Sequence, residues 1–96
     1  MYVSKDDVTV VVPTLNEEEA IGLVIQEIKQ AGYHNILVVD GYSTDRTAKI
    51  AESNACSVIF QHSKGKCGAL ETAIENVMTP YMLVMDGDCT YDPKDI

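Results

Sequence analysis

Four short runs of apolar and β-branched residues, spaced along the chain, place the strongest limit on its fold. They lie at residues 8–12, 36–39, 58–60 and 81–85. Each run is nearly continuous rather than alternating with polar residues, which is typical of strands that are covered on both faces. We therefore expect four strands in a mostly parallel sheet that lies between layers of helices.

The segment between the first two runs has the spacing of an amphipathic helix. Its apolar residues recur three and four positions apart, at Ile21, Val24, Ile25 and Ile28. Asn16 is a candidate N-cap for this helix, with Glu19 at the spacing of a capping box. The Ala31-Gly32 pair is a candidate stop, because glycine commonly follows the last turn of a helix.

Two further helices are expected after the second and third runs. Ser43 or Thr44 can cap a short helix that turns Ala48 and Ala51 inward and ends near residue 54. The segment before Pro80 has another apolar stripe, at Ala69, Leu70, Ala73, Ile74 and Val77. The predicted order is therefore β-α-β-α-β-α-β, which forms a three-layer, doubly wound α/β sheet when the crossovers are right-handed.

Charge and composition exclude several classes of function. The net charge is −8 and the seven basic residues form no run, which disfavours binding to nucleic acids or to anionic lipid surfaces. The three cysteines are widely spaced without a C-x-x-C pair, so neither a disulfide framework nor a zinc site is indicated. No apolar run approaches the roughly 20 residues of a membrane span, and no leader is evident. We therefore expect a soluble, cytoplasmic protein.

The most informative polar motif follows the fourth run, where Asp86-Gly87-Asp88 comes directly after Met85. In extended backbone both carboxylates would point to the same side, and the glycine would let a ligand approach closely. Two acids so near each other favour a shared cation, and carboxylate oxygens suit Mg²⁺ or Mn²⁺ that also binds substrate phosphates. The motif predicts a divalent metal site at Asp86 and Asp88; the alternative is a solvated acidic turn.

Polar residues also follow the first and second runs. After Pro13 a helix start carries Glu17 and two further glutamates, which the helix dipole stabilises without a ligand. Glu17 is nearest the end of the run, so a ligand role remains open for it. Asp40 ends the second run, where an aspartate can accept hydrogen bonds from a base or ribose, while Thr44 and Asp45 are more simply explained as helix caps.

Lys66 lies among glycines at the start of the third helical segment. Such a position can receive a phosphate, and the alternative is an exposed surface lysine. The spacings of a nucleoside-triphosphate loop and of a dinucleotide-binding fingerprint are both absent from the sequence. Lys66 is thus a candidate diphosphate contact. The sequence does not support a nucleoside triphosphatase or a dinucleotide-binding protein.

Taken in order, four motifs resemble those of the family 2 glycosyltransferases with the GT-A fold. They are V-x-V-V-V-P-T-L-N-E, V-V-D-G-x-S-T-D-x-T, G-K-x-G-A-L and M-D-G-D, and they extend over most of the chain. The nearest resemblance is to dolichyl- and polyprenyl-phosphate mannosyl- and glucosyltransferases. It implies that residues 1–96 are the N-terminal, nucleotide-sugar-binding half of one Rossmann-like GT-A domain, with the rest of the enzyme beyond Ile96.

The resemblance also implies an activity and a set of site residues. The activity would be inverting transfer of a sugar from a GDP- or UDP-sugar to a polyprenyl or dolichyl phosphate. The residues implied to bind the nucleotide sugar are Pro13, Leu15, Glu17, Val38, Asp40, Lys66, Asp86, Gly87 and Asp88. Asp86 and Asp88 match the family's D-x-D metal motif, and Asp88 is the expected catalytic residue. The metal would offset the charge that develops on the departing diphosphate.

Two positions depart from the family pattern, and some activities remain as alternatives. Many relatives have a second aspartate where this chain has Gly41, and a glutamine in the third metal position where it has Thr90. A receiver-like Mg²⁺-binding module would need paired acids after the first run, and a nucleotide-sugar pyrophosphorylase would need a glycine-rich, arginine-containing loop there. Neither follows Val12. We expect these 96 residues alone to have little transferase activity, and any membrane contact to come from other parts of the protein.

Overall fold

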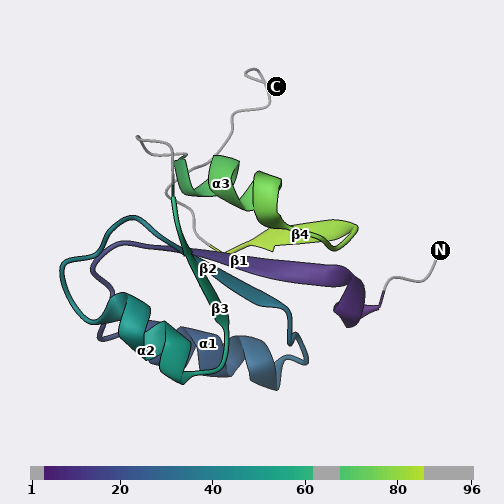
Figure 1. Cartoon of the computed structure of the whole chain (residues 1–96). Helices are drawn as coiled ribbons and strands as arrows, with labels where there is room; N and C mark the ends of the chain where they lie inside the picture. The colour runs from purple at the N-terminus through teal and green to yellow at the C-terminus, as the bar shows by residue number, and fades with distance from the viewer. Residues whose placement is uncertain (1–3, 62–67, 86–96) are drawn as a thin grey trace, which may run out of the picture.

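The computed structural model describes residues 4–61 and 68–85 and has the predicted α/β architecture. Its elements are the 3-10 helix η1 (Lys5–Asp7), β1 (Val8–Thr14), α1 (Ile21–Gln30), β2 (Ile36–Asp40), α2 (Thr47–Ser53), β3 (Ser57–Phe60), α3 (Gly68–Asn76) and β4 (Tyr81–Val84). The strands form one parallel sheet in the order β3-β2-β1-β4. Helices α1 and α2 cover one face and α3 the other (Figure 1). The three-layer prediction is confirmed.

The central strands β1 and β2 are covered on both faces, as their continuous apolar sequences predict. Val10 and Val12 of β1 pack with the α1 side chains Ile21 and Ile25, while Val11 belongs to the cluster on the α3 face. All five residues of β2 are buried. The edge strands differ, because β3 and β4 retain exposed residues. Coverage on both faces therefore holds for the centre of the sheet and not for its edges.

The order of the strands reverses between β1 and β4. Strands β2 and β3 follow β1 on one side of the sheet, and β4 pairs with the other side of β1. The Met85 amide extends this pairing by donating to the Val11 carbonyl oxygen at 2.9 Å. Sheets of this kind bind ligands beyond the carboxyl ends of their strands at such a reversal. The switch point between β1 and β4 is therefore the expected position for a ligand.

Helix α1 begins later than the predicted cap. Asn16 has a φ of 52° and lies before a turn that leads to Ile21, whose amide donates to the Glu17 carbonyl oxygen at 2.9 Å. The N-cap position is Ala20, which makes no side-chain capping bond. The predictions that Asn16 caps this helix and that Glu19 completes a capping box are wrong. The predicted stop is correct, because Gly32 follows α1 with a φ of 97°.

Helices α2 and α3 also differ in detail from their predictions. Helix α2 begins at Thr47, so Ser43 and Thr44 are too distant to cap it, and that prediction is wrong. Ala51 is buried as predicted. In α3, Ile74 is 61% exposed, and the predicted inward position of its side chain is wrong. Thr72 is buried instead, because its hydroxyl group donates to the Gly68 carbonyl oxygen within the helix at 2.9 Å.

None of the helices in the described ranges has the length and apolar content that a membrane span requires.

Candidate functional site

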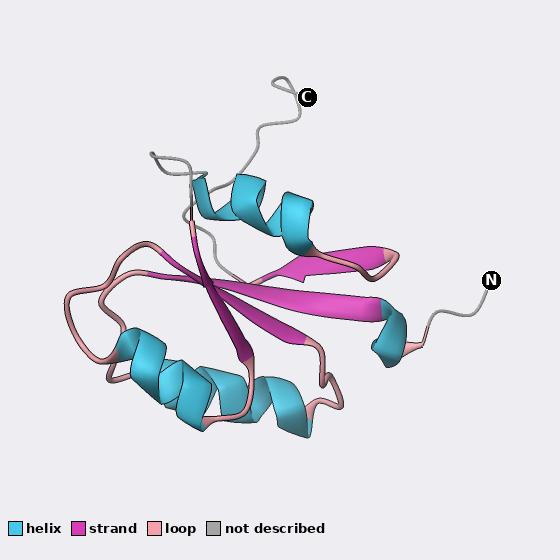
Figure 2. Cartoon of the chain, viewed as in Figure 1, coloured by secondary structure: helices cyan, strands magenta, loops and turns pink. Residues whose placement is uncertain are grey.

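Two loops meet at the carboxyl edge of the sheet. One follows β1 and leads into α1, the other follows β2 and leads into α2, and both lie at the same end of the molecule (Figure 2). The Gly41 amide donates to the Thr14 carbonyl oxygen at 2.8 Å, which continues the pairing of β1 and β2 into the loops. The structure thus brings together the sequence-predicted residues from the ends of both strands.

Asp40 is the centre of the contact between these loops. Its side chain is completely buried, and one carboxylate oxygen, Oδ1, accepts hydrogen bonds from the Thr14 hydroxyl at 2.8 Å and the Ser43 hydroxyl at 2.6 Å. The other oxygen, Oδ2, accepts from the Ser43 amide at 2.7 Å. These donors compensate the cost of burying a carboxylate. Asp40 lies at the predicted strand end, and its oxygens are directed to the protein's own loops.

Asn16 forms a second connection across the loops. Its amide N–H donates to the Ser43 hydroxyl oxygen at 2.8 Å, and its side-chain oxygen accepts from the Thr44 amide at 2.8 Å and the Thr44 hydroxyl at 3.2 Å. Asparagine tolerates the left-handed conformation found here better than most residues. The residues predicted as helix caps are therefore bonded to the opposite loop.

The segments that lead into the two helices are tied together in the same way. The Glu17 amide donates to the Thr47 hydroxyl oxygen at 2.8 Å, and the Glu18 amide donates to Asp45 Oδ2 at 3.2 Å. In return, the Arg46 amide donates to Glu18 Oε2 at 3.2 Å. Asp45 also accepts the Thr47 amide at 2.9 Å, although the N-cap position of α2 is Arg46, which makes no side-chain capping bond. Its hydrogen bond from the Thr47 hydroxyl is the main cause that lowers the pKa of Asp45.

The other described candidates differ in their exposure. Leu15 is 59% exposed, while Pro13 and Glu17 are half-buried near the end of β1. Val38 is fully buried in the cluster between the sheet and α1, so its side chain supports the edge of the sheet from within. At Gly41 an added Cβ would lie 3.2 Å from Gln61 Oε1 and 3.4 Å from the Thr14 carbonyl oxygen. A side chain at position 41 would therefore require the Gln61 side chain to shift by a few tenths of an ångström.

The predicted metal ligands lie outside the described residues. This applies to Asp86, Gly87 and Asp88, to Thr90, and to the predicted diphosphate contact Lys66. Within residues 4–61 and 68–85, no group of three or more His, Cys, Asp or Glu side chains could hold a metal ion. The structure does place β4, the strand before Asp86, beside β1 at the switch point.

Sequence reasoning missed two features of this edge. It did not find the bonds between the loops, although the signal was present as hydroxyl and amide side chains after both strands. It also missed the contact of Tyr42 with Phe60, whose rings stack with centroids 5.3 Å apart. The parallel register pairs Asp40 with Phe60, so correct strand alignment would have brought these rings near each other.

The parallel sheet with reversed strand order and polar loops at its carboxyl edge is of the Rossmann-like α/β class. Residues 9–96 match the family described as Glycosyl transferase family 2. The chain therefore belongs to this glycosyltransferase family.

Its curated relatives include glycosyltransferases of the archaeon Haloferax volcanii. Glycosyltransferase AglJ is 42% identical over 91 residues, which are 94% of this chain and 30% of AglJ. A dolichyl-phosphate hexose transferase of the same organism is 40% identical over 88 residues, which are 90% of this chain and 38% of that protein. The chain thus spans about 30–38% of the length of these two relatives.

Solved structures confirm the GT-A fold. Mannosyl-3-phosphoglycerate synthase from Rubrobacter xylanophilus superposes with a TM-score of 0.78 at 28% identity, over 91% of this chain and 32% of that one. Glucosyl-3-phosphoglycerate synthase from Mycobacterium tuberculosis in complex with UDP gives a TM-score of 0.76 at 26% identity, over 86% of this chain and 34% of that one. The likeness extends through the sheet and its helices.

Proposed function

We propose that this chain binds the donor of a glycosyltransferase reaction, a nucleotide-diphosphate sugar, at the carboxyl edge of its sheet. The observation that carries the proposal is the bonding of the β1 and β2 loops around Asp40, at the edge where ligands bind in such folds. A loop already held in place loses less conformational entropy when a ligand binds. UDP in the related M. tuberculosis synthase supports a nucleoside diphosphate as the ligand.

Among the described residues, we assign direct and indirect roles by exposure. Pro13, Leu15 and Glu17 retain accessible surface beside the end of β1, and they line the donor site. Asp40 is buried and bonded to three donor groups, so it acts on the donor by holding the loops in position. Val38 contributes through packing beneath the same edge.

The metal site of the proposal comprises Asp86 and Asp88, with Gly87 between them. Two carboxylates are a fitting donor set for Mg²⁺ or Mn²⁺, and a related synthase was solved with Mn²⁺ and UDP. When bound, such an ion neutralises charge on the departing diphosphate. Asp88 and Lys66 would hold the diphosphate from the protein side, and Asp88 is the residue most important for transfer.

For the acceptor we propose a polyprenyl or dolichyl phosphate. Support comes from the 40% identity to a dolichyl-phosphate hexose transferase, compared with 26–28% to the phosphoglycerate-linked synthases. The phosphate of such an acceptor is already ionised, so it needs little assistance from a general base. We further propose that the donor is a GDP- or a UDP-sugar. Transfer would invert the configuration at the sugar carbon that is attacked.

Calorimetric titration with UDP and GDP, each with and without Mn²⁺, tests the donor site. We expect Mn²⁺ to tighten the binding of at least one nucleotide, and Asp88→Asn to abolish that tightening. Glu19→Gln is the matched control, because it also removes one carboxylate, from an exposed position outside the proposed metal site. Equal affinity with and without the metal would contradict the assignment.

A further inference from the structure

Two aromatic rings form an exposed stack at the carboxyl edge of the sheet. Tyr42, two residues beyond β2, lies against Phe60, the last residue of β3, with ring centroids 5.3 Å apart and ring planes inclined by 22°. Tyr42 is 65% exposed and Phe60 is 47% exposed. The pair is therefore a surface feature rather than part of the core, and much of the Tyr42 ring is open to solvent.

The backbone at Tyr42 is unusual for a tyrosine. Its φ is 63°, in the left-handed region that favours glycine and asparagine. The neighbouring Ser43 holds the backbone there through its amide and hydroxyl bonds to Asp40. A bulky residue in this conformation is characteristic of ligand sites, where the surrounding structure maintains the strain. The chain thus places an aromatic side chain where glycine would fit the backbone more easily.

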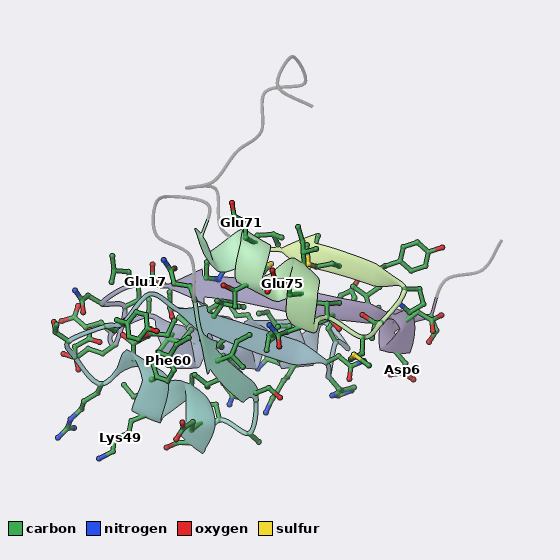
Figure 3. The ribbon with its side chains drawn as sticks, turned by 45° about the horizontal axis from the view of Figure 1, so that its top comes forward. Asp6, Glu17, Lys49, Phe60, Glu71 and Glu75 are labelled. Carbon is green, nitrogen blue, oxygen red and sulfur yellow. The ribbon has the colours of Figure 1, made fainter. Side chains whose placement is uncertain are left out.

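The position of the stack suits one end of an elongated ligand. Phe60 pairs with Asp40 across the sheet, and β3 lies three strands away from β4. Neighbouring strands are about 4.8 Å apart, so the ends of β3 and β4 are separated by roughly 14 Å. A nucleoside diphosphate has its base and its terminal phosphate at opposite ends. Figure 3 shows Phe60 toward the same end of the molecule as Glu17, with Asp6 at the opposite end.

We propose that Tyr42, supported by Phe60, is the surface on which the base of the donor nucleotide stacks. This inference rests on the proposed function, because it assumes that the diphosphate binds beyond β4. Stacking on an aromatic ring accepts any base, since every base has a π-face. It also agrees with the buried carboxylate of Asp40, whose hydrogen bonds are made within the protein. Tyr42 therefore adds affinity for the base without selecting between uracil and guanine.

Calorimetric titration of the full chain in Mn²⁺ with UDP, GDP and inorganic pyrophosphate tests the role of the ring. Tyr42→Gly removes the ring and keeps the backbone, because glycine adopts a φ of 63° readily. We expect this change to weaken UDP and GDP binding about tenfold and to leave pyrophosphate binding unchanged. Tyr42→Phe should retain the affinity. Tyr81→Ala is the matched control, because Tyr81 is another tyrosine, 44% exposed, at the start of β4 and thus at the other side of the sheet from β3.

The outcomes separate this inference from the proposed function. Unchanged affinity of Tyr42→Gly for both nucleotides, with or without a lower melting temperature, would assign the stack to packing and overturn the inference. An equal loss of pyrophosphate binding would also overturn it, because the ring would then act on the whole site rather than on the base. If the unsubstituted chain binds neither nucleotide in Mn²⁺, the proposed function itself fails.

Discussion

At the scale of single residues, the carboxylate of Asp40 organises the candidate site. It is completely buried, and it accepts hydrogen bonds from Thr14 at the end of β1 and from Ser43 in the loop after β2. Its place at a strand end could be predicted from the sequence. The direction of its side chain could not, because Thr14 is 26 residues away and becomes a neighbour only when β1 and β2 pair.

Thr14→Val tests the contribution of this network. The substitution keeps the shape of the side chain and removes the hydroxyl donor, leaving Asp40 Oδ1 with one partner fewer. We expect the free energy of unfolding to fall by about 1–3 kcal/mol, the range for a buried polar group that loses a partner. Denaturant unfolding measures it.

Ser53→Ala is the control for that measurement. It removes a hydroxyl group that bonds to the Lys49 carbonyl oxygen on the exposed surface of α2. Exposed substitutions of this kind usually change stability by less than about 0.5 kcal/mol. Equal effects of the two substitutions would show that the bonds to Asp40 carry no special weight.

At the scale of elements, α1 and α2 end in related ways. After α1, the Gly32 amide donates to the Lys29 carbonyl oxygen and the Tyr33 amide to the Ile28 carbonyl oxygen, as in a Schellman motif. After α2, Ala55 occupies the position that corresponds to Gly32, with a φ of 59°.

The following residue differs between the two helix ends. The Cys56 thiol, rather than an amide, donates to the Ala51 carbonyl oxygen, at 3.1 Å. Burial raises the pKa of Cys56, which keeps the thiol protonated as a donor. Cys56 is partly buried and packs against the cluster between the sheet and α1.

Exchanging the residues at these two helix ends should change stability in opposite directions. Gly32→Ala places a Cβ on a left-handed residue and should cost about 1–2 kcal/mol. Ala55→Gly relieves the same strain and should stabilise the chain by up to about 1 kcal/mol, after the larger entropy of glycine in the unfolded state is deducted. Thermal and denaturant unfolding measure both changes. Stabilisation by Gly32→Ala would contradict the assignment of these helix ends.

The same elements explain how far the fold could be predicted. Apolar patterning located the four strands and the three α-helices of the described residues, because burial against the sheet determines that pattern. It did not predict the 3-10 helix η1, which has no buried residues. Helix starts were less predictable, since Asn16, Ser43 and Thr44 are good capping residues that bond across the loops instead. The outward position of Ile74 was missed because Thr72 could take the buried position with its hydroxyl bonded inside the helix.

At the scale of the whole molecule, the loops at the carboxyl end of the sheet are bonded to each other, while the edge strand β4 is partly exposed. The loops after β1 and β2 are bonded together at the carboxyl end, beside the switch point. By contrast, Tyr81 and Leu83 of β4 and Met85 directly after it are 44–49% exposed. The sequence motifs indicated the carboxyl edge correctly as the place where polar residues gather. The strand order that creates the switch point followed only from the pairing of β4 with β1.

The most direct test of this account is to locate bound Mn²⁺ by its paramagnetic broadening of backbone amide signals in NMR spectra. With UDP present, Mn²⁺ should broaden the signals of Thr14, Gly41 and Met85 at the carboxyl ends of the strands. It should spare Asn35 and Ser57, which lie at the amino ends of β2 and β3. Mg²⁺ is the diamagnetic control, and Asp88→Asn should abolish the pattern. Broadening that is centred on Asn35 and Ser57, or that is the same without UDP, would contradict binding of the donor and its metal at the carboxyl edge.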